Sequence, residues 1–264
     1  MSKQAEAQQH GADESHGHDA RVVTYGMAID LDKCTGCMAC SVACQQENNV
    51  SFRKDESNKL RSITWMEVYQ LDNGKEYPEF RYTYLPRPCM HCDAPHHSPC
   101  TFVCPVNATV RDERTGLVDH IPVRCIGCRY CMVACPYHAR YFNWWDPRWP
   151  EPMEQMLSPK VSTRMRGVIE KCSFCSHRLN KASDLARSKG EYDPAKITYT
   201  PACVEACPTG AITFGNLMDP DSEVSQLSRD PRAFRLLAKL HTEPKVYYLS
   251  KHKWVQALGD NDLG

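Results

Sequence analysis

Sixteen cysteines are the residues of this 264-residue chain whose spacing could do chemistry. The stretch Cys125–Pro136 is the most regular and reads C-x2-C-x2-C-x3-C-P, with cysteines at Cys125, Cys128, Cys131 and Cys135. With this spacing three thiolates bind one four-iron, four-sulfur cluster, while the fourth thiolate binds a different cluster. Gly127 lets the backbone pass close to inorganic sulfide, and Pro136 turns the chain away. Because the fourth cysteine needs a partner, one such stretch predicts another.

Three further groups follow or lengthen the pattern. The first group keeps the spacing without a trailing proline and comprises Cys34, Cys37, Cys40 and Cys44. The second has a gap of seven residues in its middle and comprises Cys89, Cys92, Cys100 and Cys104. The last is split by a 27-residue insertion and comprises Cys172, Cys175, Cys203 and Cys207. Together the four groups predict four [4Fe–4S] clusters.

Other uses of cysteine explain the spacing less well. Structural zinc needs only paired C-x2-C ligands. A zinc site would therefore not explain why a third cysteine, a fourth cysteine and a proline follow at fixed spacing. Disulfides between such close cysteines would be strained. A redox-active C-x-x-C would be expected beside a thioredoxin-like βαβ pattern, which the chain lacks. A structural zinc protein stays open as an alternative, which an assay for acid-labile sulfide decides.

Charge and hydropathy narrow the class of protein. The chain carries 32 Lys and Arg against 32 Asp and Glu, whereas nucleic-acid binders show a basic excess, so no nucleic-acid partner is expected. No apolar run approaches the roughly 18–20 residues that cross a bilayer. The polar tail 1–21 is expected to be disordered and to lack a Sec or twin-arginine leader. Its three histidines could bind a metal, although a solvated tail is the simpler interpretation.

The segments that must position the cysteines read mostly as short strands. Val22–Ile29 predicts a strand before the first group. Ile63–Tyr69 and Tyr77–Tyr84 predict β segments around a turn at Asp72–Gly74, with aromatic side chains that serve packing. Ala108–Ile121 predicts a hairpin that leads into the third group. The seven-residue gap of the second group, with His96 and His97, is expected to form surface, or else to face a partner.

The second half mixes irregular chain with helix and strand. The Trp- and Pro-rich segment from residue 143 to about 166 is too irregular for a helix, and its tryptophans either pack over the core or form a contact patch. A helix is expected from Ser176, an exit strand at Thr209–Phe214, a helix at Pro231–His241 and a strand at Lys245–Ser250. The C-terminal extension is expected to wrap the body or to dock a partner.

Three runs carry a family resemblance: Cys34–Asn48, Cys135–Phe142 and Cys172–Leu179. They resemble the four-cluster iron–sulfur subunits of membrane complexes of the dimethyl-sulfoxide-reductase superfamily, which include the electron-transfer subunits of polysulfide, tetrathionate and dimethyl sulfoxide reductases. The resemblance covers about residues 24–216. Within this family the long second loop, the absent leader and the Trp-rich insert most resemble the iron–sulfur subunits of menaquinone reductases of sulfate-reducing bacteria.

The resemblance implies a ligand set for each cluster. Cluster one would take Cys34, Cys37, Cys40 and Cys207; cluster two Cys172, Cys175, Cys203 and Cys44; cluster three Cys89, Cys92, Cys100 and Cys135; cluster four Cys125, Cys128, Cys131 and Cys104. Some relatives lack one cysteine of the third group and carry a three-iron cluster. Because Cys128 is present here, four [4Fe–4S] clusters are expected, although one could be isolated as [3Fe–4S].

The resemblance also implies an α+β fold of two nested bacterial-ferredoxin-like modules with a pseudo-twofold relation, plus β-hairpin, loop and C-terminal extensions. The expected divisions are a tail at 1–21, an outer module at 22–86 and 166–220 (clusters one and two), an inner module at 87–145 (clusters three and four), a Trp/Pro-rich connector at 146–165 and a C-terminal extension at 221–264. Four positive side chains flank cysteines and could raise nearby reduction potentials or simply be solvated: Lys33, Arg124, Arg129 and Lys171.

The implied function is electron transfer in a membrane-bound quinone oxidoreductase of anaerobic respiration. Four clusters in a row would turn one long transfer into several short hops. The implied partners are a large molybdopterin-family subunit at cluster one, a multi-span integral quinone-binding subunit at cluster four and, in the menaquinone reductase version, a multihaem cytochrome c subunit. The alternatives are a terminal reductase that moves electrons from quinol to a sulfur compound and a free soluble polyferredoxin.

The expected location is peripheral to the cytoplasmic membrane. A leaderless chain fits the periplasmic face if a partner with a twin-arginine signal carries it across after its clusters are inserted. The cytoplasmic face is the alternative.

Overall fold

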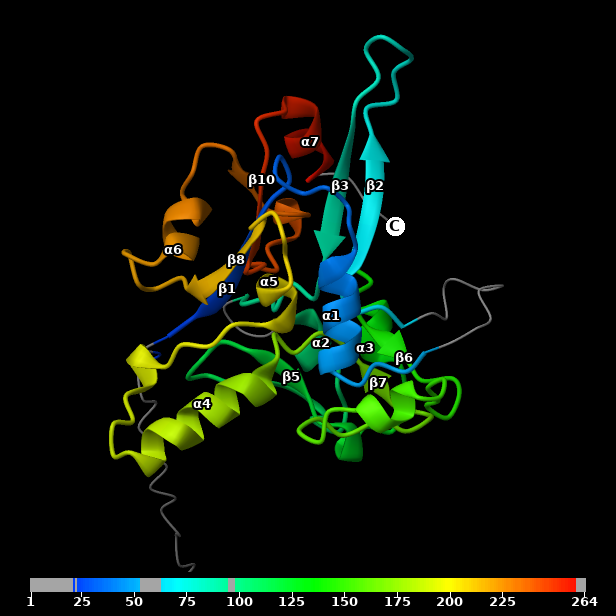
Figure 1. Ribbon diagram of the computed structural model, residues 1–264, viewed down its shortest axis with the longest axis vertical. Coiled ribbons are helices and arrows are strands. Elements are labelled where there is room, and N and C mark those ends of the chain that lie inside the picture. The colour runs from blue at the N-terminus through cyan, green and yellow to red at the C-terminus, as the bar shows by residue number, and fades with distance from the viewer. Residues whose placement is uncertain (1–20, 22, 53–62, 95–97, 260–264) are drawn as a thin grey trace, which may run out of the picture.

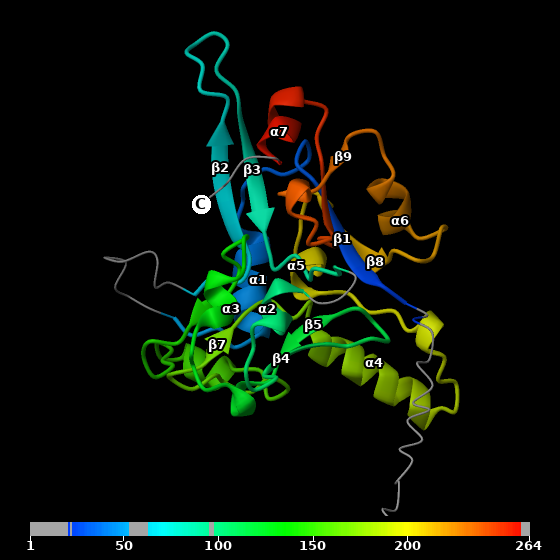
Figure 2. The same ribbon diagram turned by 180° about the vertical axis from the view of Figure 1, so that it is seen from behind.

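The computed structural model describes residues 21, 23–52, 63–94 and 98–259 and is shown from two sides in Figures 1 and 2. Its strands are β1 Tyr25–Asp30, β2 Glu67–Asp72, β3 Tyr82–Arg87, β4 Thr109–Arg111, β5 Val118–His120, β6 Tyr141–Phe142, β7 Ile169–Glu170, β8 Ile212–Asn216, β9 Ala233–Phe234 and β10 Val246–Leu249. Its α-helices are α1 Ala39–Glu47, α2 Pro99–Phe102, α3 Tyr130–Val133, α4 Ser176–Ser188, α5 Ala202–Glu205, α6 Glu223–Ser228 and α7 Lys253–Leu258. Short 3₁₀ turns lie at Pro122–Arg124, Met153–Met156, Pro194–Lys196 and Ala238–Leu240.

The strand pairs follow a cyclic rule. The strand that leaves one cysteine group pairs antiparallel with the strand that enters the next group: β2 with β3, β4 with β5, and β6 with β7. The strand that leaves the last group, β8, pairs antiparallel with β1, which enters the first. The chain therefore closes on itself, and β1 and β8 lie side by side in Figure 1.

The C-terminal segment enlarges the closing pair into a sheet of order β8-β1-β10-β9. β10 runs parallel to β1, and its Val246, Tyr248 and Leu249 side chains are fully buried. The strand expected at Lys245–Ser250 is thus confirmed, and the extension forms part of the core.

The helix expected at Pro231–His241 is wrong. This segment holds β9 and a 3₁₀ turn, because β9 pairs with β10. Leu237 and His241, on either side of the turn, have φ values of 49° and 51°, which no right-handed helix accommodates. Pairing with a buried neighbour outweighs the local helical periodicity here.

The hairpin expected between residues 63 and 84 is present but shifted toward the C-terminus. β2 and β3 pair from Glu67 opposite Arg87 to Asp72 opposite Tyr82, and residues 73–81 form a loop. Asp72 Oδ1 accepts the Gly74 N–H at 2.8 Å, so the expected turn only begins this longer loop. The hairpin projects from the body in both views (Figures 1 and 2).

The other expected elements are confirmed, with small shifts: the first strand as β1, the hairpin before the third group as β4 and β5, the helix from Ser176 as α4 and the exit strand as β8. Cysteines are part of the hydrophobic core, where buried thiols alternate with side chains such as Met27, Phe174 and Tyr248. Among the residues the structure describes, no helix combines the length and the apolar character needed to span a membrane.

Replacing Leu249 by Ala should destabilise the sheet. Leu249 is fully buried and packs with Ala28 and Val224, and a buried Leu→Ala change typically costs about 2–5 kcal/mol. We expect a clearly lower denaturant midpoint for Leu249→Ala, measured by circular dichroism under anaerobic conditions. Leu240→Ala, at a half-exposed position of the same extension, should leave the midpoint nearly unchanged. Equal midpoints for both variants would show that β10 adds little to stability.

Candidate functional site

The sixteen cysteines are all free thiols and gather into four sets, each of which draws on two cysteine groups. We name them site one (Cys34, Cys37, Cys40, Cys207), site two (Cys44, Cys172, Cys175, Cys203), site three (Cys89, Cys92, Cys100, Cys135) and site four (Cys104, Cys125, Cys128, Cys131). The four cysteines of site one line a single pocket, and so do those of site four. The assignment of these sets as the ligands of four separate clusters stays a prediction.

The cysteines of sites two and three lie close enough to shift the pKa values of other cysteines in the same site. Burial, and then the thiolates of Cys172, Cys203 and Cys175, raise the pKa of Cys44 well above its usual value. In site three burial, and then the thiolates of Cys89, Cys135 and Cys100, raise the pKa of Cys92 in the same way. Without metal the chain therefore holds Cys44 and Cys92 as thiols, and binding of iron would release their protons.

The four sites form a row. Site one lies beside site two. Burial and the thiolates of Cys172 and Cys175 raise the pKa of Cys203 in site two, and Cys40 of site one raises it further. Burial, and then Cys89 of site three, raise the pKa of Cys172 in site two to about 12. Cys100 of site three likewise lies beside Cys131 of site four. The row therefore runs from site one to site four in numerical order.

Only the two ends of this row reach the surface. Cys37 in site one and Cys128 in site four are exposed, whereas every cysteine of sites two and three is buried. Electrons could therefore enter and leave at sites one and four, while the two inner sites are shielded from water.

One backbone conformation recurs in all four cysteine groups. The residue just before the second cysteine has a positive φ each time: +69° at Gly36 and Gly127, +45° at His91 and +52° at Phe174. At Gly127 a Cβ would lie 2.2 Å from the Gly167 carbonyl oxygen, so only glycine fits there. A non-glycine residue in this region costs about 1–3 kcal/mol, and the sequence offered no signal that His91 and Phe174 adopt it.

The two strained side chains compensate by stacking on each other between sites two and three. The rings of His91 and Phe174 are 3.8 Å apart between centroids and nearly parallel. His91 Nδ1 accepts the Val118 N–H at 3.1 Å, so Nε2 carries the hydrogen and donates it to the Cys172 carbonyl at 3.1 Å. Burial, and then the charge of Lys171, hold the pKa of His91 well below its usual value. The ring is therefore a neutral packing element.

Backbone N–H groups point at the thiols in a repeated way. Cys104 Sγ accepts from the Ala108 N–H at 3.2 Å, and Cys207 Sγ accepts from the Ala211 N–H at 3.3 Å. In both places a left-handed residue, Asn107 or Gly210, turns the chain back after the Cys-Pro pair. Hydrogen bonds to cluster sulfur are one of the means by which proteins set a reduction potential. The donor set therefore fits [4Fe–4S] clusters.

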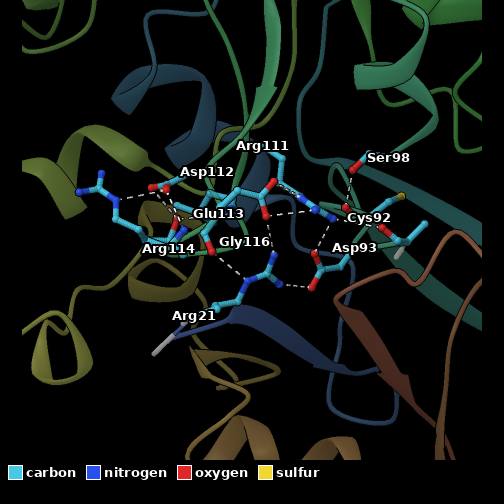
Figure 3. A network of polar contacts seen from close by, with 12 residues as sticks. Arg21, Cys92, Asp93, Ser98, Arg111, Asp112, Glu113, Arg114 and Gly116 are labelled. Carbon is cyan, nitrogen blue, oxygen red and sulfur yellow. Dashed lines mark hydrogen bonds and ion pairs between the residues drawn. The ribbon is translucent and has the colours of Figure 1, made fainter. Parts of the chain in front are cut away.

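A polar network closes the seven-residue gap of the second group (Figure 3). Asp93 accepts hydrogen bonds from Arg21 at 2.5 Å and from Arg111 at 3.2 Å. At the other end of the gap the Ser98 hydroxyl donates to the Cys92 carbonyl at 2.5 Å. These contacts hold Cys92 and Cys100 near each other despite the lengthened loop. The expectation for His96 and His97 lies outside the described residues.

The tryptophans of the irregular segment have divided roles. Trp149 Nε1 donates to the Val50 carbonyl at 3.2 Å and ties the segment to the end of α1. Trp144 packs edge-on against Phe142 beside site four, whereas Trp145 is 40% exposed. Two of them therefore pack against the body, and Trp145 faces outward.

Of the four cations that flank cysteines, only Lys171 is buried. Its ammonium donates to the Cys172 carbonyl at 2.8 Å and to the Val118 carbonyl. Lys33, Arg124 and Arg129 are exposed. The structure adds two buried cations near the thiols, Arg140 and Lys245, which sequence reasoning missed because neither lies next to a cysteine in the chain.

Within the described ranges no three His, Cys, Asp or Glu side chains lie close enough to bind one metal ion. The four-cysteine sites are compatible with this, because a cubane has an iron at each of four corners and separates its thiolates more widely than a single zinc ion does.

Replacing Asp93 by Asn should weaken site three. Each hydrogen bond to a charged partner contributes about 1.5–3 kcal/mol, so the variant should lose its visible cluster absorbance at a lower denaturant concentration than the unmodified chain. Lys75→Gln breaks an ion pair with Glu79 on the exposed hairpin loop and should change this midpoint little. If the two variants behave alike, the network does not support Cys92.

Comparisons with known proteins agree with this geometry. Two models described as 4Fe–4S dicluster domains match residues 80–150 and residues 33–108 with 124–211. The iron–sulfur cluster-binding subunit of the menaquinone reductase of Nitratidesulfovibrio vulgaris is 55% identical over 244 residues, which are 91% of this chain and 94% of that protein. The Hdr-like menaquinol oxidoreductase iron–sulfur subunit 1 of Archaeoglobus fulgidus is 40% identical over 85% of this chain and 82% of its own length.

The arsenate respiratory reductase iron–sulfur subunit of a Shewanella species is 36% identical over 85% of this chain and 95% of its own length. Two dicluster domains and sixteen free cysteines correspond to four [4Fe–4S] clusters. The chain therefore belongs to the family of four-cluster iron–sulfur subunits of the dimethyl-sulfoxide-reductase superfamily.

Proposed function

We propose that the chain relays electrons within a membrane-bound quinone oxidoreductase, from a periplasmic cytochrome and molybdopterin-like side to menaquinone at an integral membrane subunit. The observation that carries this proposal is the row of four cysteine sites with exposed cysteines only at its two ends. A free electron carrier needs one accessible site, whereas a relay between two partners needs two accessible ends and an insulated middle.

In this proposal each of sites one to four binds the correspondingly numbered cluster. One-electron storage is what a bound [4Fe–4S] cluster supplies there. The chain's own residues bury the inner thiols, exclude water and direct N–H groups at sulfur. Its numbered sites lie side by side, which keeps each electron transfer short.

We also propose that the two pairs of sites form nested modules with a pseudo-twofold relation, with the divisions given by the sequence. α1 packs against α5 at sites one and two, and α2 packs against α3 at sites three and four. Gly36 and Gly127 share φ +69°, and Met38 and Arg129, each before a helix, share φ +64°. These equivalent conformations support the proposed pseudo-twofold relation between the outer and inner modules.

The exposed ends suggest where partners bind. Large apolar side chains surround site four on the surface, where soluble monomers rarely gather such residues: Phe102, Val123, Ile126, Tyr130 and Val133. This apolar rim suits an integral quinone-binding subunit. Met38 and Val42 are exposed beside site one and suit the large molybdopterin-family subunit, with a multihaem cytochrome c subunit further out.

The relatives favour menaquinone as the acceptor, because the Nitratidesulfovibrio protein is named as a menaquinone reductase subunit. A second candidate is relay in the outward direction to a terminal reductase, which the name of the arsenate respiratory reductase relative supports. We place the complex at the periplasmic face by co-export with a partner, and the cytoplasmic face is the alternative outcome.

Anaerobic purification of the tagged chain from its own membranes tests the function. We expect the chain to co-purify with a haem protein, a molybdopterin-like subunit without molybdenum and an integral membrane protein. A molybdenum-containing partner without haem would favour the terminal reductase. Recovery of the chain alone in the soluble fraction would contradict the membrane complex.

In the same experiment, two matched variants test which partner binds at each end of the row of sites. Val133 is 88% exposed and Val42 is 60% exposed, so glutamate is tolerated sterically at both. Val133→Glu should lose the integral subunit and keep the large one, whereas Val42→Glu should do the reverse. Loss of the same partner from both variants would refute the proposed orientation.

Cysteine variants test the crossed ligand sets. Cys207→Ala and Cys34→Ala lie far apart in the chain but should abolish the same electron paramagnetic resonance signal, because both belong to site one. Cys203→Ala lies only four residues from Cys207 and should instead share its effect with Cys44→Ala. If Cys203→Ala and Cys207→Ala remove one common signal, the assignment is wrong.

A further inference from the structure

Arg140 presents an unusual buried charge. Arg140 is only 3% exposed, and its Nη1 donates to Thr109 Oγ1 at 3.1 Å. Its Nη2 has no hydrogen-bond partner, and no carboxylate of the described chain pairs with it. A buried charge without a partner costs several kcal/mol, so something must compensate it when the protein is complete.

The groups that face Arg140 are thiols of two neighbouring sites. Burial disfavours its charge, yet the thiolates of Cys100 and Cys131, followed by Cys89 and Cys135, outweigh burial and raise its pKa. Cys131 belongs to site four, and the other three belong to site three. The guanidinium therefore lies at the junction of these two sites.

A hydrogen-bonded chain holds it there. Because Arg140 donates to Thr109 Oγ1, the Thr109 hydroxyl is free to donate to His120 Nδ1, 3.2 Å away. The hydrogen of the neutral His120 ring then sits on Nε2, which also has no partner. His120 lines the pocket formed by the cysteines of site four. The Nη2 of Arg140 and the Nε2 of His120 thus remain without partners beside sites three and four.

Two other buried cations, Arg164 and Lys171, differ in this respect. Arg164 pairs with Glu170 at 2.7 Å and donates to the carbonyls of Asn48 and Asn49. Lys171 donates to two backbone carbonyls. Their charges or donors are already matched within the protein, whereas those of Arg140 are directed at the thiols.

We propose that Arg140, held by Thr109 and His120, is a positioning residue that raises the reduction potentials of clusters three and four together. One-electron reduction makes a cluster one charge more negative and changes no bond or proton, with the electron supplied by the neighbouring cluster, which is oxidised. A fixed positive charge in the low-dielectric interior favours the more negative, reduced form. This inference rests on the proposed ligand sets.

The test is a redox titration of the intact complex followed by electron paramagnetic resonance. In Arg140→Gln the ratio of reduced to oxidised cluster at fixed potential should fall about tenfold or more for two of the four clusters, which corresponds to about 59 mV. Arg140→Lys keeps the charge and should restore most of the ratio. Lys33→Gln removes an exposed charge beside site one and should change every ratio by less than about twofold, because water and salt screen it.

The outcomes separate this inference from the proposed function. If Arg140→Gln keeps its iron and acid-labile sulfide but shifts no cluster, or shifts all four equally, the inference is wrong and the relay stands. If the unmodified complex lacks four cluster signals, the proposed function fails. If Arg140→Gln loses clusters, Thr109→Val provides the test, because it keeps the positive charge but removes the hydrogen bond that holds the guanidinium. A smaller fall in the ratio of reduced to oxidised cluster for the same two clusters supports the inference, and an unchanged ratio overturns it.

Discussion

The burial of many cysteine thiols beside one another is the constraint on which this structure depends. Each site brings four cysteines together, and at sites two and three all of them are out of water. Desolvation and like charge both oppose ionisation there, as the raised pKa values of Cys44 and Cys92 show. Iron would remove this cost on binding the thiolates, so we expect cluster binding to favour the folded state. The core of the protein is in this sense built around its cofactors.

The grouping of cysteines from distant parts of the chain accounts for the rest of the architecture. Site one combines Cys207 with the first cysteine group, and site four combines Cys104 with the third group, so groups that are distant in sequence must lie against one another. The cyclic pairing of strands provides this contact, from β2 with β3 round to β8 with β1. The closing pair is extended by β10 and β9, which buries the strand that leads into site one. The long inserts are attached to this ring without disturbing it, as the network around Asp93 shows (Figure 3).

A relay also needs its sites to differ. The ends of the row are exposed and its middle is enclosed, so dielectric and hydrogen bonding change from site to site, and both act on reduction potential. The buried cations are distributed unevenly: Lys171 lies beside site two, and Arg140 lies between sites three and four. This gradient of environment arises from tertiary packing, since the four cysteine groups themselves are chemically alike.

The cofactor and the number of clusters can be predicted from the amino-acid sequence, because cysteine spacing is a local property and a loop of three cysteines wraps a cubane without help from distant residues. Most strands can be predicted as well, from their local residue patterns. The same spacing predicts that the fourth cysteine of a group binds a different cluster from the first three. Three features follow from contacts between distant residues. The segment Pro231–His241 forms β9, which pairs with β10, instead of a helix. His91 and Phe174 stack on each other with left-handed backbones, and Arg140 faces two sites at once. Each of these depends on a neighbour far away in the chain, and the energy of burying or pairing with that neighbour exceeds the local preference that a sequence displays.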